Sequence, residues 1–143
     1  MNALIDTSVW SLALRRRPLN LTAAEQLIVD ELADLAREGR ARIIGLIRQE
    51  LLSGIKTATQ YEKLRSALRA FPDEPLATSD YEGAAKAGND CRSRGISVSV
   101  VDALICQVAL ARQWGIFTLD SDFKAYATVL PIKLHPIRGA KGT

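Results

Sequence analysis

An apolar run that begins almost at the first residue and stops at a carboxylate is the feature that most constrains this chain. The run predicts a short buried strand that ends in Asp6, followed at once by Thr7 and Ser8, whose hydroxyls can cap a helix. A similar pattern returns near the other end of the chain, where Asp120 follows the apolar residues 116–119. The carboxyl ends of parallel strands form the ligand-binding edge of a sheet. We therefore expect both carboxylates at one edge of one sheet.

The segments between these two acids alternate between predicted helices and short strands. Capping-box patterns, in which an acid or amide follows a hydroxyl residue by three positions, begin at Thr22, Thr57 and Ser79. A further helix after Ser99 is apolar nearly all round and is therefore expected to be buried. We expect strands at 3–6, 42–45, 116–119 and 132–134, a weak strand at 76–77, and helices near 8–14, 22–38, 46–55, 57–70, 79–94, 100–114 and 121–127. This alternation predicts an α/β fold with a mainly parallel sheet.

The composition is that of a globular protein with one core. The chain has 143 residues, of which 48% are hydrophobic and 24% charged. We expect one domain over residues 1–136 and a flexible tail over 137–143, where apolar residues are few. No apolar run could span a bilayer and no secretory signal pattern opens the chain, so a cytoplasmic location without membrane partners is expected. The isolated Cys91 and Cys106 favour reduced structural thiols.

The charge of the chain permits a polyanionic partner. The net charge is +3 and the pI about 9.1, and arginines gather in a run at 15–17 and recur along the chain. The planar guanidinium group of arginine suits phosphate better than the ammonium group of lysine does. For any single arginine, however, a solvated surface is the simpler interpretation.

Two acidic residues interrupt apolar helix patterns. Glu50 shares a predicted helix face with Ile47 and Leu51, where a carboxylate is costly unless something pairs with it. The alternative is that Glu50 lies at the edge of this stripe and reaches solvent, or pairs with a nearby arginine. Asp102 lies near the start of the apolar helix after Ser99, where it could equally complete a helix cap.

Taken together, four acids could converge on one edge of the sheet: Asp6, Glu50, Asp102 and Asp120. Asp120 and the nearby Asp122 could also be turn or helix-capping residues. Like charges at short range stay ionised together only if something cancels them, and a divalent cation does so. An all-oxygen set without a His or Cys cluster suits Mg²⁺ or Mn²⁺. With the arginines, such a site points to hydrolysis of a phosphodiester.

These motifs, in this order, resemble the PIN-domain nucleases, and within them the VapC-type toxins of bacterial toxin–antitoxin pairs. The resemblance rests on residues 4–10, 50–54, 101–105 and 117–123 and covers nearly the whole chain. It implies an α/β/α sandwich around a parallel sheet and an Mg²⁺- or Mn²⁺-dependent endoribonuclease that cleaves RNA. It also implies a homodimer and a cognate antitoxin that occupies a groove of the toxin.

The resemblance also implies roles for individual residues. The positions that match the family's catalytic and metal-binding acids are Asp6, Glu50, Asp102 and Asp120. Glu50 is expected to bind the metal directly or through water, or to help activate the nucleophile. The supporting positions are Thr7, Thr118 and Asp122, of which the two hydroxyls could orient a carboxylate.

Other functions fit parts of the pattern. A haloacid dehalogenase-type phosphatase also begins with a strand ending in Asp, but it needs a second Asp two residues later, where this chain has Ser8. A receiver domain normally carries a lysine after a late strand, and here Asp120 and Asp122 come first. A PIN-like RNA-processing nuclease that is not a toxin, and an inactive module that binds RNA or protein, are the remaining alternatives.

Overall fold

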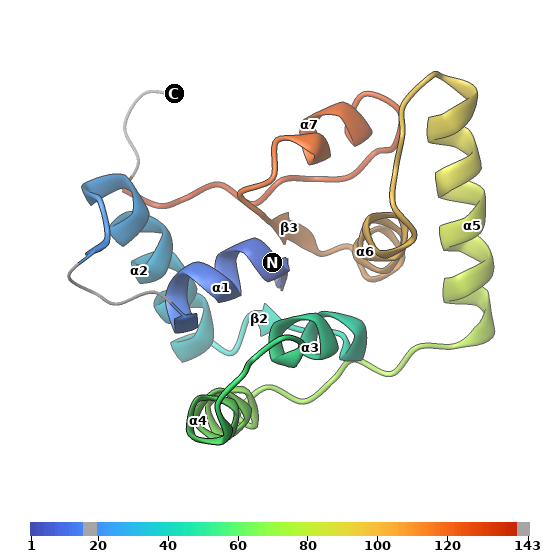
Figure 1. Cartoon of the computed structure of the whole chain (residues 1–143). Helices are drawn as coiled ribbons and strands as arrows, with labels where there is room; N and C mark the ends of the chain where they lie inside the picture. Colours follow the sequence, from blue (N-terminus) through green and yellow to red (C-terminus); the bar gives the residue numbers. More distant parts are fainter. Residues whose placement is uncertain (16–19, 140–143) are drawn as a thin grey trace.

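Three short strands form a parallel sheet in the computed structural model, which describes residues 1–15 and 20–139 (Figure 1). The strand order is β2 (Ala41–Arg42), β1 (Ala3–Ile5), β3 (Gly115–Phe117). All three residues of β1 are fully buried, because this strand pairs with a neighbour on each side. The apolar run at the start of the chain is thus the centre of the sheet.

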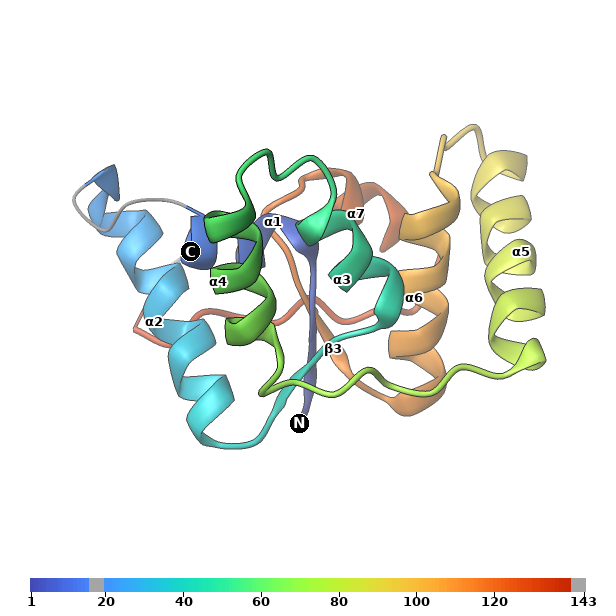
Figure 2. The same cartoon turned by 60° about the horizontal axis from the view of Figure 1, so that its bottom comes forward.

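Helices enclose the sheet. Those in the described part of the chain are α1 (Thr7–Arg15), α2 (Ala23–Arg37), α3 (Gly45–Leu52), α4 (Ala58–Leu68), α5 (Thr78–Ser93), α6 (Val100–Arg112) and α7 (Asp122–Tyr126). Both views place the strands between α2 on one side and the α5–α6 pair on the other (Figures 1 and 2). The predicted single α/β/α domain with a parallel central sheet is confirmed.

Several predicted helix starts are confirmed by their caps. The Thr22 hydroxyl accepts a hydrogen bond from the Glu25 amide, and the Glu25 carboxylate accepts one from the Thr22 amide, so both halves of the first capping box form. Thr57 and Ser99 each accept from an amide three residues later. As predicted, α6 is largely buried, with residues 103–106 among its core positions.

The third helix cap was predicted two residues late. The N-cap is Ala77 and not Ser79, and the helix begins at Thr78. The reason is Asp80, whose carboxylate accepts a hydrogen bond from the Ala77 amide (2.8 Å) and also pairs with Arg112 of α6. Asp80 therefore makes Ala77 the cap by a local hydrogen bond, and the same carboxylate ties the first turn of α5 to α6.

The predicted strands are longer than those observed. The expected strand at 42–45 ends at Arg42, because Ile44 is already the N-cap of α3. The candidate at 76–77 is not a strand; Asp73 instead forms an isolated bridge with Ile43. The expected strand at 132–134 is reduced to one bridge between Leu134 and Ile116. These two bridges cover the outer edges of the small sheet.

The contacts between the C-terminal segment and the domain extend beyond residue 136, into the predicted tail. Ile137 packs against the core, and Arg138 bonds to the carboxylates of Glu31 and Glu38. Residues 140–143 of the predicted tail, and Arg16 and Arg17 of the basic run, lie outside the described residues. The domain boundary at residue 136 stays a prediction. As expected, Cys91 and Cys106 are buried free thiols. Within the described ranges, no helix has the length and apolarity that a bilayer span requires.

Candidate active site

Asp6 is held where the central strand ends. It directly follows β1, and its carbonyl accepts hydrogen bonds from the amides of Val9 and Trp10, so α1 starts from this residue. Its side chain is only 8% exposed. The hydroxyls of Ser8 (2.8 Å) and Thr118 (2.7 Å) both donate to its Oδ2 atom. These two donors fix the carboxylate while its Oδ1 atom receives no hydrogen bond from any described residue.

Ser8 also connects the start of α1 to the loop that follows β3. Its hydroxyl accepts a hydrogen bond from the Leu119 amide (3.0 Å), and the Thr118 hydroxyl accepts one from the Asp120 amide (3.0 Å). The loop after β3 is therefore docked on the start of α1. From the sequence, the Thr7–Ser8 pair is expected to start the helix and to steady Asp6, but only Thr7 is named among the site residues; the structure shows that Ser8 is the member of the pair that bonds to Asp6.

Asp120 lies on this docked loop with its side chain exposed. Its Oδ1 atom accepts a hydrogen bond from the amide of Asp122, the first residue of α7 (2.9 Å). The turn-forming role considered for Asp120 is thus real. It uses one carboxylate oxygen, and the side chain still reaches solvent beside Asp6. Asp122 is likewise exposed, at the start of the short helix.

Glu50 lies at the edge of the apolar stripe of α3 and not within it. Ile47 and Leu51 are fully buried, whereas Glu50 is exposed to solvent. The Thr7 hydroxyl donates a hydrogen bond to Glu50 Oε1 (2.9 Å), across 43 positions of sequence. The alternative that Glu50 reaches solvent is therefore correct. The same contact brings it to the residue next to Asp6.

Asp102 occupies the first turn of α6 and is half-buried. Its amide donates to the Ser99 hydroxyl (3.0 Å), so its backbone takes part in the helix cap, as the alternative interpretation proposed. Its carboxylate accepts a hydrogen bond from the Tyr126 phenol (2.6 Å). Tyr126 was not among the predicted site residues, because nothing in its local sequence distinguishes it from a core aromatic.

The ionisation of Asp102 links three of the acids. Burial raises the pKa of this carboxyl, and the negative charges of Asp6 and Asp120 raise it further, while the Tyr126 hydrogen bond opposes them. Burial and the bond to Asp102 raise the pKa of the Tyr126 phenol, which keeps that phenol a donor. Asp6 and Asp120 therefore both lie close enough to Asp102 to disfavour its negative charge.

The donor chemistry of the site fits a hard divalent cation. Asp6, Asp102 and Asp120 offer oxygen atoms, and a bound cation would relieve the repulsion that Asp6 and Asp120 exert on Asp102. Among the residues that the structure describes, no three or more His, Cys, Asp or Glu side chains are placed so that they could hold a metal ion without a change in their positions. His135 is bonded to the buried Glu31 (2.6 Å) and belongs to a structural pair. Metal binding by the acids stays a prediction.

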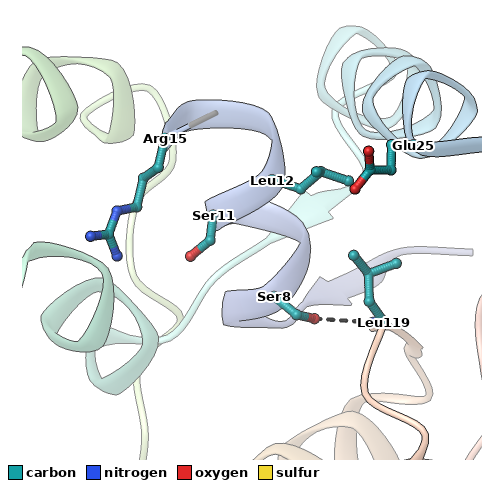
Figure 3. A pocket seen from close by; sticks show the side chains of 6 residues that line it. All are labelled: Ser8, Ser11, Leu12, Arg15, Glu25 and Leu119. Carbon is teal, nitrogen blue, oxygen red and sulfur yellow. Dashed lines mark hydrogen bonds between the residues drawn. The ribbon is translucent and has the colours of Figure 1, made fainter. Parts of the chain in front are cut away.

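A hollow of about 480 Å³ opens beside this edge of the sheet (Figure 3). It lies between α1 and α2 and is lined by Ser8, Ser11, Leu12, Arg15, Glu25 and Leu119. Ser8 and Leu119 belong both to the hollow and to the frame around Asp6, and the bond between them is drawn in Figure 3. None of the four acids lines the hollow, which adjoins the site through Ser8 and Leu119.

Comparison with known proteins identifies the family. The chain matches the crystal structure of FitAcB from Neisseria gonorrhoeae at 19% identity and a TM-score of 0.74, over 96% of this chain and 99% of the other. VapBC2 from Rickettsia felis, bound to a DNA fragment from its promoter, matches at 18% identity and a TM-score of 0.73, over 94% of this chain and 98% of the other. A toxin–antitoxin complex from Klebsiella pneumoniae matches at 19% identity and a TM-score of 0.60, over 85% of this chain and 90% of the other. No curated protein matches the chain. At these identities the solved structures establish the fold, and a family model described as PIN domain matches residues 3–129. The chain therefore belongs to the PIN-domain family.

Proposed function

We propose that this PIN domain is a metal-dependent endoribonuclease that acts as the toxin of a toxin–antitoxin pair. The observation that carries the proposal is the meeting of Asp6, Asp102 and Asp120 at one edge of the sheet, with Asp6 buried and held by two hydroxyls. Burying a carboxylate and placing two more beside it is costly. Binding of a cation that in turn binds a phosphodiester would offset this cost.

Each residue has a defined task in this proposal. Asp6, Asp102 and Asp120 would hold the Mg²⁺ or Mn²⁺ ion, and Glu50 would bind it directly or through water, or help to activate the nucleophile. When bound, the ion lowers the pKa of a coordinated water and offsets charge on the phosphate. Ser8 and Thr118 orient the Asp6 carboxylate by their hydrogen bonds to its Oδ2 atom, and Thr7 orients Glu50 in the same way.

The RNA strand is expected to leave the acids through the neighbouring hollow. Arg15, which lines it, would contact a phosphate, and Ser11 would offer a hydroxyl to the same strand. Contacts of this kind position an RNA backbone without reading its sequence. The net charge of +3 favours binding of a polyanion.

The partners in the proposal rest on the family and on its solved relatives. The Klebsiella pneumoniae structure is a toxin–antitoxin complex, and VapBC2 was solved on DNA from its own promoter. By analogy, this chain would bind a cognate antitoxin, form a homodimer and act in the cytoplasm. Leu119, which is 43% exposed at the hollow, gives a protein partner an apolar side chain to bury.

The enzymatic part is tested by RNA cleavage with Mg²⁺, with excess chelator, and with the Asp6→Asn variant. We expect cleavage that needs the metal and returns when Mn²⁺ is added back, and an activity in Asp6→Asn lower by on the order of 100-fold or more. Asp90→Asn is the matched control, because Asp90 is an exposed residue of α5. Cleavage that resists chelation, or full activity in Asp6→Asn, would contradict the proposal.

The toxin role needs a separate experiment. Expression of the chain should arrest growth, and co-expression of the protein encoded by a small neighbouring gene should relieve the arrest. Cleavage without arrest would favour the RNA-processing nuclease. Mn²⁺ binding without turnover on any RNA would favour the inactive binding module.

A further inference from the structure

Tyr126 donates a hydrogen bond to one of the acids from a buried position. Its phenol oxygen lies 2.6 Å from Asp102 Oδ2, and its side chain is only 2% exposed. A donor–acceptor distance this short is typical of a hydrogen bond to an ionised carboxylate. The two residues lie on different helices, α7 and α6, and are 24 positions apart.

The packing around Tyr126 leaves its ring little freedom. The ring meets that of the fully buried Phe123 edge to face, with centroids 5.1 Å apart. The carbonyl of Tyr126 accepts a hydrogen bond from the Leu130 amide (2.8 Å). A phenol buried among apolar groups needs a hydrogen-bond partner, so its direction is determined by Asp102.

The helix that carries Tyr126 also begins beside another acid. Asp120 accepts a hydrogen bond from the amide of Asp122, the first residue of α7, and α7 lies next to α6 (Figures 1 and 2). One end of this short helix is therefore bonded to Asp120 and the other to Asp102. The helix acts as a spacer between the two carboxylates.

We propose that Tyr126 is a positioning residue that sets the placement of Asp102 relative to Asp120 for cation binding. The inference rests on the proposed function, because it takes Asp102 as a metal ligand. The phenol occupies the Oδ2 atom of Asp102, so Oδ1 is the oxygen that Asp102 would offer to a cation. It acts through Asp102 and touches neither the ion nor the RNA.

The test is the Tyr126→Phe variant, which keeps the buried ring and removes only the donor. Mn²⁺ alone is titrated into the full chain without RNA, and bound ion is followed by electron paramagnetic resonance. Loss of an outer hydrogen bond to a metal ligand typically weakens metal binding by about 10- to 100-fold, and we expect a dissociation constant raised by about 10-fold. Tyr81→Phe is the matched control, because Tyr81 is 55% exposed on α5.

The melting temperature without metal separates positioning from mere packing. A purely structural role would lower the melting temperature of Tyr126→Phe and leave its Mn²⁺ dissociation constant at the wild-type value, which would overturn the inference. A wild-type chain that binds no Mn²⁺ would overturn it as well.

Failure of the proposed function looks different. If the wild type binds Mn²⁺ and cleaves no RNA, while Tyr126→Phe binds about 10-fold more weakly, the inference stands and the nuclease proposal falls. If RNA is cleaved and both proteins bind Mn²⁺ equally, the inference alone is overturned.

Discussion

Replacing Ser8 by alanine should loosen the Asp6 carboxylate without unfolding the domain. The substitution removes two hydrogen bonds: the one that Ser8 donates to Asp6 and the one that it accepts from the Leu119 amide. Thr118 keeps its own bond to the same carboxylate oxygen, so Asp6 is not left unpaired. The helix start is retained, because the Asp6 carbonyl still accepts from the first amides of α1.

The size of the effect follows from where each bond lies. A hydrogen bond to a charged group contributes about 1.5–3 kcal/mol. Asp6 is 8% exposed, so water replaces the lost Ser8 donor poorly, but the remaining Thr118 bond places the cost at the low end, about 1–2 kcal/mol. The Leu119 amide lies on an exposed loop where water can bind it, so its loss adds little. If the whole cost appears in the transition state, kcat/KM falls about 5- to 30-fold.

The assay is metal-dependent RNA cleavage together with thermal unfolding. We expect the melting temperature of Ser8→Ala to fall by about 3–8 °C for a domain of this size. Ser66→Ala is the matched control, since Ser66 is an exposed serine of α4 far from the acids in sequence. It should change neither the rate nor the melting temperature.

The double variant with Thr118→Val gives the decisive comparison. Each single variant leaves Asp6 with one donor, whereas the double variant leaves it with none. Residues that share a partner are not additive, so the double variant should lose more than the sum of the two single losses. A strictly additive result, or a Ser8→Ala protein as active as wild type, would refute the idea that the two hydroxyls jointly hold Asp6.

Two further predictions concern buried groups outside the site. The Arg112 ion pair and the Ala77 amide hold the pKa of Asp80 below 3.8, so the stability that this carboxylate contributes is present above that value and is lost as the pH falls below it. Asp80→Asn should lower the free energy of unfolding by about 2–3 kcal/mol at neutral pH. The loss is smaller than for a fully broken buried pair, because Arg112 still pairs with Glu74. Urea titrations at several pH values measure it, and equal acid sensitivity of the wild type and the variant would argue against this role of Asp80. Burial raises the pKa of the Cys106 thiol to about 12, so alkylation of this thiol at pH 8 should require unfolding of the protein. Mass spectrometry measures the labelling, and rapid labelling of Cys106 in the native protein would contradict the prediction.

The parts of the fold that were predicted correctly depend on local pattern. The apolar run before Asp6 is a strand because a short apolar segment ended by a helix cap suits a central parallel strand. The helix α6 is buried because its apolar residues leave no polar face. The order of the four acidic motifs was also visible in one dimension, and it led to the family that the comparison confirms.

The errors lie where distant segments meet. The strand expected at 42–45 is cut short because α3 begins at Gly45, and its edge is completed by Asp73. The first turn of α5 is tied to α6 by an ion pair between Asp80 and Arg112, which lie 32 positions apart. No pattern within either segment contains that information.

By itself the sequence determined the fold class, the central strand and the kind of groups that gather at its end, because hydrophobic periodicity and chain order are local properties. The tertiary structure decided which hydroxyl serves which carboxylate. Thr118 lies 112 positions from Asp6 and Tyr126 lies 24 from Asp102, and each bond forms at less than 3 Å. Contacts of that length depend on how the sheet and helices pack, which no short stretch of sequence records.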